Sequence, residues 1–399
     1  MSSLIPRGGR YVKQLTGYRA FVPAPLPPDP PIALDAGLVQ LLSRADQAVG
    51  RLDGVTQTLP NPDLFVAMYV RREAVYSSQI EGTQSTLEDV LTFELDPRGR
   101  DLPGDVEEVV NYVRAMNYGL ERLMTLPLSL RLIREIHAEL LRDVRGAEKH
   151  PGEFRTTQNW IGSANVPLSR ASFIPPAPSD MMVALSDFEQ FLHEEHSLPM
   201  LIRCGLAHVQ FETIHPFLDG NGRTGRLLIT FLLVHEGVLH RPLLYLSHYL
   251  KRHRAEYYDR LMAVREAGDW EGWLRFFLRG VAETAEEATI TARAIVQLQG
   301  EHRLLIQEQG LGVNGLRLLD LLFQRPLANI KLVEEKLGVV YMTANKLVDQ
   351  FVGLGLLAEI TGGRRNRIFR YLPYWLLFQE PEPLPNQNVP IQTTETGTP

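Results

Sequence analysis

Apolar residues recur at helical spacing over most of the chain, and this pattern predicts a mainly α-helical fold. It begins at Ile32 and continues to about Thr125, and within it Pro62 follows a helix-capping residue, which predicts a helix from Pro62 towards Ser78. The same spacing predicts five further helices, at residues 128–143, 179–193, 200–213, 224–235 and 256–266.

Three segments interrupt the helical pattern. Residues 1–31 include the proline-dense run FVPAPLPPDPP and are expected to form an extended arm of polyproline type. Residues 152–178 are rich in Thr, Gly, Asn and Ser, and they predict a β-hairpin, called the flap below. The tail 379–399 contains mostly Pro, Gln, Asn and Thr and is expected to be disordered.

The pattern changes after a connecting helix expected at residues 282–312. Residues 313–378 read as two helices, at 330–337 and 343–354, followed by two short strands around a Gly-Gly turn, an order similar to that of a winged helix-turn-helix domain. The presumed wing is basic, which fits binding to DNA phosphates, whereas winged helices also dock proteins, so both partners stay open. Its arginines are Arg364, Arg365, Arg367 and Arg370.

Composition limits the class of protein. A chain of 399 residues with 44% hydrophobic content can bury two or three structural units. It contains neither an apolar run of about eighteen residues nor an N-terminal signal sequence, so we expect a cytoplasmic protein without a membrane segment. The formal charge of −6 argues against coating of the whole surface by nucleic acid. The single cysteine, Cys204, lies in an apolar run and is expected to be a buried, inert thiol.

The chemistry of the chain is concentrated in HPFLDGNGRTGR, residues 215–226, which connects two of the predicted helices. Gly220 and Gly222 are expected to adopt positive φ and to bring backbone N–H groups close to a ligand. The N-terminus of the following helix adds its dipole and its unpaired N–H groups. This combination predicts a phosphate site.

The same twelve residues fit the signature HxFx(D/E)GNGRxxR, and the chain therefore resembles the Fic family. The resemblance implies a Fic-type helical bundle with a β-hairpin flap, and transfer of AMP from ATP to protein hydroxyls. It implies the following roles: His215 as general base, Asp219 as ligand of Mg²⁺, Asn221 and the two glycines around it at the α-phosphate, and Arg223 and Arg226 at the departing pyrophosphate.

A second resemblance concerns the run SSQIEG, which matches the inhibitory motif (S/T)xxxE(G/N) of many Fic proteins. Ser77 and Glu81 are four residues apart and share one helix face. In the family this glutamate pairs with the second motif arginine, here Arg226, and takes the place of the ATP γ-phosphate. Because the motif precedes the active-site loop in the same chain, the resemblance implies an intramolecular block and an inactive resting state.

The resemblance also divides the chain and suggests partners. It implies that the flap pairs with an extended target segment bearing a Ser, Thr or Tyr hydroxyl, and it allows a homodimer. The aromatic face of Tyr258 is a candidate for binding the adenine, and packing of this ring in the core is the alternative. The expected units are the arm 1–31, an N-terminal helical region 32–125 with the inhibitory helix, a catalytic core 126–281, the connecting helix 282–312, the winged helix 313–378 and the tail 379–399.

The leading hypothesis is an autoinhibited protein adenylyltransferase that uses ATP and Mg²⁺. Three alternatives stay open at this stage. The first is a DNA-binding regulator that senses nucleotide, the second is a Fic enzyme with another nucleotide donor, and the third is one that removes AMP.

Overall fold

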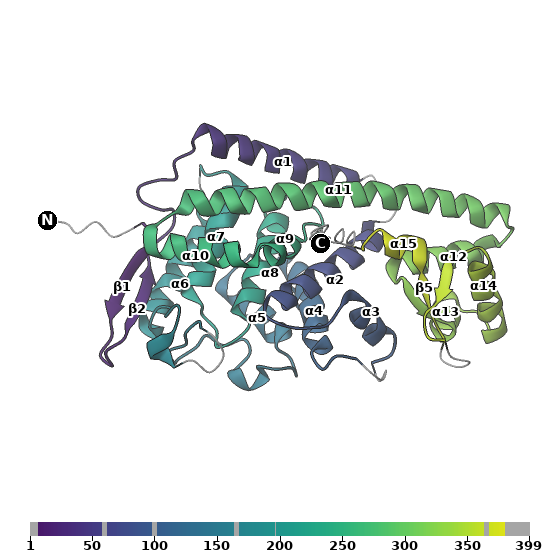
Figure 1. Ribbon diagram of the computed structural model, residues 1–399, viewed down its shortest axis with the longest axis horizontal. Coiled ribbons are helices and arrows are strands. Elements are labelled where there is room, and N and C mark those ends of the chain that lie inside the picture. The colour runs from purple at the N-terminus through teal and green to yellow at the C-terminus, as the bar shows by residue number, and fades with distance from the viewer. Residues whose placement is uncertain are drawn as a thin grey trace, which may run out of the picture.

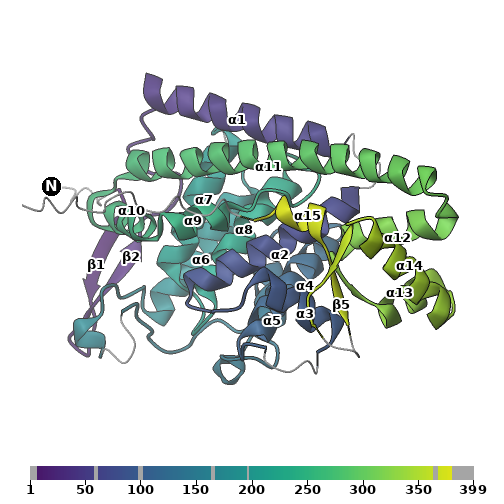
Figure 2. The same cartoon turned by 45° about the vertical axis from the view of Figure 1, so that its right-hand side comes forward.

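One long helix, α11 (Trp270–Glu308), runs from one end of the molecule to the other (Figure 1). Helix α1 (Ala36–Gln57) lies along it, and the pair stays side by side after a 45° turn (Figure 2). The buried residues of α1 recur every three or four positions, which forms the apolar stripe that packs on α11. The computed structural model describes residues 7–57, 62–97, 102–162, 167–195, 197–362 and 367–379.

A bundle of helices packs beneath this pair. At its centre lie α7 and α8, in which almost every side chain is buried. Cys204 of α7 is completely buried, as expected, and burial raises the pKa of its thiol. The bundle consists of α2 (Pro62–Ile80), α3 (Leu87–Leu95), α4 (Val106–Leu123), α5 (Leu130–Leu140), α6 (Pro178–His193), α7 (Met200–Ile214), α8 (Asn221–His235), α9 (Leu246–Arg252) and α10 (Arg254–Ala267).

The helix expected at residues 282–312 is present to Glu308, but it continues from α11 without a break at the expected boundary between residues 281 and 282. The helix begins at Trp270, after Asp269, whose side chain accepts a 3.0 Å hydrogen bond from the Gly272 N–H. Buried Val281, Ala285 and Ala288 continue one apolar stripe past the expected boundary. The first part of α11 therefore belongs to the bundle core.

The expected polyproline arm contains a β-hairpin of β1 (Gly9–Lys13) and β2 (Arg19–Pro23), so this prediction is wrong for residues 9–23. Phe21 is buried, and its N–H donates a 2.9 Å hydrogen bond to the Ile174 carbonyl. Burial of this ring explains why the chain here is a strand. Residues 24–35 have no regular structure, and residues 1–6 lie outside the described part.

The flap at 152–178 is only weakly paired. Among its described residues a single antiparallel bridge joins Ile161 to Phe173, and a 3-10 turn follows the gap at Leu168–Arg170. Residues 163–166 lie outside the described part. The expected hairpin is therefore reduced to one bridge, because much of the hydrogen bonding of its stems is directed to other segments, as shown below.

The C-terminal unit lies at the far end of α11 (Figure 1). It contains a helix pair and a three-stranded antiparallel sheet of order β3-β5-β4, close to the elements predicted from the sequence. As a winged helix-turn-helix domain the unit stays a prediction. Its elements are α12 (Gly312–Gln324), β3 (Leu327–Asn329), α13 (Ile330–Leu337), α14 (Tyr341–Gly353), β4 (Leu357–Glu359), β5 (Ile368–Tyr371) and α15 (Leu372–Leu376).

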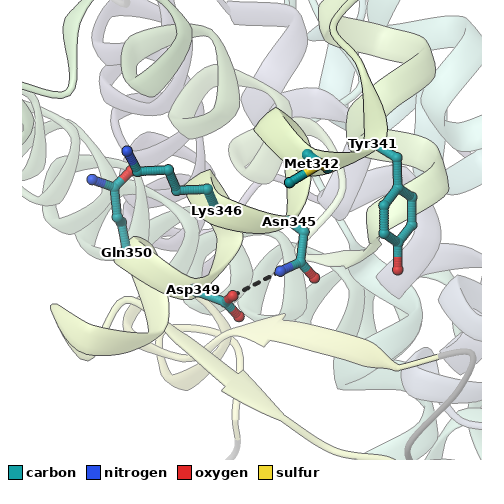
Figure 3. A pocket seen from close by; sticks show the side chains of 6 residues that line it. All are labelled: Tyr341, Met342, Asn345, Lys346, Asp349 and Gln350. Carbon is teal, nitrogen blue, oxygen red and sulfur yellow. Dashed lines mark hydrogen bonds between the residues drawn. The ribbon is translucent and has the colours of Figure 1, made fainter.

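The outer face of α14 forms a shallow polar pocket (Figure 3). Within it the Asn345 side chain donates a 2.8 Å hydrogen bond to Asp349. The wing residue Arg367 also contacts this pair, since its guanidinium lies 2.9 Å from the Asn345 side-chain oxygen and 3.8 Å from Asp349. The six residues of the pocket are Tyr341, Met342, Asn345, Lys346, Asp349 and Gln350.

A second wing arginine, Arg370, faces inward and forms a 2.5 Å ion pair with Glu88 of α3. Two of the four arginines expected to contact DNA are thus paired within the protein, which weakens that expectation. Arg364 and Arg365 lie outside the described residues, as does 380–399 of the expected tail. None of the helices described is both long and apolar enough to span a membrane.

Candidate active site

The loop between α7 and α8 reverses the chain at the centre of the bundle. His215 ends α7 with a positive φ of 50°, a left-handed conformation that is uncommon for a residue with a side chain. Gly220 precedes α8 with a φ of 74°, as expected for a glycine. The motif therefore lies on a tight turn whose far end is the N-terminus of a buried helix, where unpaired N–H groups favour an anion.

Asn221 holds this turn together. Its side-chain oxygen accepts a 2.8 Å hydrogen bond from the Phe217 N–H, and its side-chain nitrogen donates one of 2.8 Å to the Phe217 carbonyl. The amide is buried and engaged at both ends, so it shapes the loop from within. The expected role of Asn221 at the α-phosphate stays a prediction.

Gly222 also differs from the expectation, because it does not adopt a positive φ and lies in the first turn of α8. Its missing side chain has another purpose. A Cβ atom at this position would come within 2.3 Å of Glu81 Oε1 and 3.0 Å of the Arg226 guanidinium. Glycine is required here to leave room for that carboxylate.

The imidazole of His215 is neutral at ordinary pH. Burial, followed by the charges of Arg265 and Arg155, lowers its pKa to about 4. Its Nδ1 atom is buried and has no hydrogen-bond partner among the described residues. A neutral imidazole can accept a proton from a hydroxyl, which is what a general base requires.

Asp219 lies at the mouth of the loop. One carboxylate oxygen accepts a 2.7 Å hydrogen bond from the Gly220 N–H, and the other lies 3.1 Å from Lys149 Nζ. Burial raises the pKa of this carboxyl, but Lys149 and the Gly220 N–H outweigh it, so the net pKa is lower than usual. Asp219 is therefore ionised, and the Lys149 ammonium lies beside one of its carboxylate oxygens.

A single ionised carboxylate fits Mg²⁺ that is bound together with a nucleotide, because that ion completes its shell with phosphate oxygens and water. Within the described residues no group of three or more His, Cys, Asp or Glu side chains could form a metal cage by itself. The donor set at Asp219 thus suits a metal that arrives with ATP.

Both motif arginines are buried and paired with acidic residues from the N-terminal helices. Arg223 donates a 3.1 Å hydrogen bond to Glu108 of α4, and the same carboxylate oxygen accepts one of 3.2 Å from Arg145. Sequence reasoning did not find Glu108. The only signal was a carboxylate inside the apolar face of a predicted helix, between Val106 and Val109.

Arg226 is held by the last turns of α2. Its Nε donates to the Ser77 hydroxyl at 2.8 Å, and its Nη2 donates to the Ser77 carbonyl at 2.9 Å and to Glu81 Oε1 at 2.7 Å. Partial burial raises the pKa of Glu81, but the charge of Arg226 outweighs this effect, so the net pKa is lower than usual. The structure thus joins the two residues of the SSQIEG motif to the second motif arginine.

Tyr258 lies on α10 and is 37% exposed. Its ring is tilted by 44° against that of Tyr257, with 5.1 Å between the centroids, and the Arg254 guanidinium lies over it at 5.4 Å. Burial, and then the charge of Glu81, raises its pKa. The tyrosine thus offers a partly open aromatic face, and its role towards adenine stays a prediction.

His137 of α5 is a further residue that sequence reasoning missed. Its ring stacks on Phe217, with the centroids 3.7 Å apart and an angle of 4° between the planes. Its Nδ1 accepts a 2.9 Å hydrogen bond from the Gly152 N–H, and its Nε2 lies 2.9 Å from the Asp219 carbonyl. Only the neutral tautomer with a proton on Nε2 satisfies both contacts. His137 therefore links the start of the flap to the loop.

Comparison with known families agrees with this site. Residues 39–121 match the Fic/DOC family N-terminal model, and residues 127–233 match the Fic/DOC family model. The second match includes the whole loop, and the first includes the Ser77–Glu81 turn of α2. Over these residues the chain matches the Fic/DOC family.

Curated relatives are named protein adenylyltransferase Fic. The chain is 32% identical to the one from Culex quinquefasciatus over 250 residues, which are 61% of this chain and 45% of the relative. It is 31% identical to the one from Drosophila melanogaster over 218 residues, which are 53% of this chain and 40% of the relative. The chain thus spans less than half the length of these relatives.

Solved structures share the fold. A Fic family protein from Desulfovibrio desulfuricans G20 superposes with a TM-score of 0.55 at 19% identity, covering 86% of this chain and 97% of that one. A Fic domain containing signaling protein from Bacteroides thetaiotaomicron gives 0.50 at 18% identity, covering 66% and 97%. These matches support the Fic-type helical bundle.

Proposed function

We propose that this chain is a protein adenylyltransferase, which transfers AMP from ATP to a hydroxyl of a protein, and that Glu81 keeps it inactive at rest. The observation that carries the proposal is the contact between Glu81 and Arg226 inside a complete Fic loop. The names of the curated relatives support the reaction, and the intact glycine at position 222 favours AMP transfer over phosphorylation.

In this mechanism His215 takes the proton of a Ser, Thr or Tyr hydroxyl. The hydroxyl oxygen then attacks the α-phosphorus in line, the bond from that phosphorus to the bridging oxygen breaks, and pyrophosphate leaves. Asp219 would hold Mg²⁺, which neutralises charge on the phosphates when it is bound. Arg223 and Arg226 are the forked donors available to the pyrophosphate.

The block follows from competition for Arg226. While the guanidinium bonds to Glu81 and Ser77, its donors are not available to a γ-phosphate, and the Glu81 carboxylate would repel that phosphate. The Glu81 side chain is 33% exposed, so it closes the buried arginine from the solvent side. ATP can bind productively only after this carboxylate turns away.

The test is incubation of the protein with Mg²⁺ and α-labelled ATP. We expect Glu81→Gly to label itself or an added protein at least about tenfold more than wild type. A tenfold change in rate corresponds to about 1.4 kcal/mol of activation free energy. The double variant Glu81→Gly, His215→Ala is the control for chemistry and should give no label. Label from γ-labelled ATP would instead indicate phosphate transfer, and equal labelling of wild type and Glu81→Gly would refute the block.

Parallel reactions with GTP, UTP and CTP decide the donor. Release of AMP from a labelled target tests whether the same site also runs in reverse. Binding of ATP by Glu81→Gly without transfer of label would favour a nucleotide sensor.

A further inference from the structure

Arg155, at the base of the flap, is a buried cation without an acidic partner. Its exposed fraction is 3%, and within the described part of the chain it forms no ion pair. Instead its guanidinium donates to three backbone carbonyls: His215 at 3.0 Å, Thr157 at 3.1 Å and Pro176 at 2.6 Å. A charge buried in this way is costly and is retained only where its geometry is needed.

The three carbonyls come from three places that the reaction must align. Thr157 and Pro176 lie on the two stems of the flap, and His215 is the proposed base. The Asn159 side chain contacts the same loop: its nitrogen lies 3.3 Å from the His215 carbonyl and 2.8 Å from the Phe217 carbonyl. The backbone N–H of Arg155 donates a 2.9 Å hydrogen bond to the Pro216 carbonyl. Three consecutive loop carbonyls are thus bonded to residues 155–159.

This network explains how His215 keeps its unusual backbone. A left-handed conformation costs a residue with a side chain roughly 1 kcal/mol or more, and it persists only where the surroundings determine it. The hydrogen bond from Arg155 Nε fixes the peptide plane that follows the His215 Cα atom. That plane fixes ψ of His215 and with it the direction in which the side chain leaves the backbone.

We propose that Arg155 is a positioning residue for AMP transfer, which sets the direction of the His215 imidazole and fixes both flap stems relative to it. The inference rests on the proposed function. It adds that a target segment paired with the flap is held in rigid register with the base, because one side chain bonds to both.

The charge of Arg155 provides a readout that separates positioning from simple stability. The charged groups that affect His215 are Arg265 of α10 and Arg155, which lower its pKa after burial, and Glu81 of α2, which raises it. The Glu212 backbone of α7 also raises it. Removal of the Arg155 charge therefore raises the pKa of His215, while lysine at this position keeps the charge.

The experiment compares Arg155→Gln and Arg155→Lys in the Glu81→Gly protein. We expect Arg155→Gln to lower kcat by about a hundredfold, the effect of a 1 Å misplacement, with the Kd for ATP changed less than about twofold. The acid limb of the pH profile should move to higher pH in Arg155→Gln and stay in place in Arg155→Lys. The control Arg203→Gln removes a guanidinium near the start of α7, at the opposite end of that helix from His215, where it contacts the Leu192 carbonyl and Glu236. It should leave kcat unchanged.

Two results would overturn the inference. The first is an unchanged kcat in Arg155→Gln. The second is an equal loss of kcat in Arg155→Gln and Arg203→Gln that parallels an equal loss of melting temperature. NMR titration of the His215 imidazole, assigned with His215→Ala, adds a measurement that needs no activity. If Glu81→Gly transfers no AMP, the proposed function fails, and a His215 pKa that does not rise in Arg155→Gln then refutes the Arg155 inference separately.

Discussion

Gly222 and Glu81 occupy one space at the start of α8: a methyl group on Gly222 would lie 2.3 Å from the Glu81 carboxylate. The carboxylate would have to turn away and give up its 2.7 Å bond to Arg226. We therefore expect Gly222→Ala to destabilise the wild-type protein by about 1–3 kcal/mol.

The same substitution should behave differently in the Glu81→Gly protein. There the space is open on that side, and alanine is intrinsically better than glycine in a helix by roughly 0.5–1 kcal/mol. The double-mutant cycle, measured by urea unfolding, should give a coupling of at least about 1 kcal/mol. Additive effects would show that Glu81 does not occupy this space in solution.

Glu108 forms ion pairs with both Arg223 and Arg145, and these two partners allow a matched comparison. Glu108→Ala leaves the buried Arg223 without its acid, so we expect a loss of about 3 kcal/mol or more in unfolding free energy. Arg145→Ala removes the other partner, whose side chain is 61% exposed, and should cost at most about 1 kcal/mol. Urea unfolding of both variants checks the ranking, and equal losses would contradict it.

His208 provides a pH dependence. It is buried between the Gly225 carbonyl, at 3.1 Å, and the Tyr257 hydroxyl, at 2.9 Å, and burial lowers its pKa from 6.5 to about 3. Below pH 6.5 the unfolded chain therefore binds a proton that the folded chain excludes, and stability falls as the pH falls.

The contribution of this one group is roughly 1.4 kcal/mol for each pH unit between 6.5 and 5. His208→Gln should be less stable than wild type at pH 7, yet its unfolding free energy should fall more gently over that range. Parallel slopes for the two proteins would mean that His208 is protonated in the folded state.

Much of the architecture could be predicted because its determinants are local. The helices that flank the loop were expected at 200–213 and 224–235 and are Met200–Ile214 and Asn221–His235. Two runs of mostly apolar residues at helical spacing, with Gly220 between them, are enough to place them. The pairing of Glu81 with Arg226 was predicted from a motif resemblance, and the structure contains this ion pair.

What could not be predicted depends on contacts between distant segments. Glu108 and Arg223 are 115 residues apart, and no local pattern marks one as the partner of the other. Arg155 reads as an ordinary surface cation until the fold surrounds it with carbonyl groups. The strand that contains Phe21 was hidden because the six prolines between residues 23 and 31 are typical of an extended arm. The burial of its ring depends on Phe173, 5.8 Å away.

The outer face of α2 is covered by the C-terminal unit. The Phe378 ring packs edge-on against Tyr69, at 5.7 Å, and lies 5.6 Å from the Arg72 guanidinium. Glu81 directly follows the last residue of α2, so a rigid displacement of α2 that frees Arg226 must also break these aromatic contacts, whereas rotation of the Glu81 side chain alone need not. Thermodynamic linkage then applies to the first route: a ligand that weakens the C-terminal packing favours the release of Arg226, and ATP bound at Arg226 weakens that packing by the same free energy.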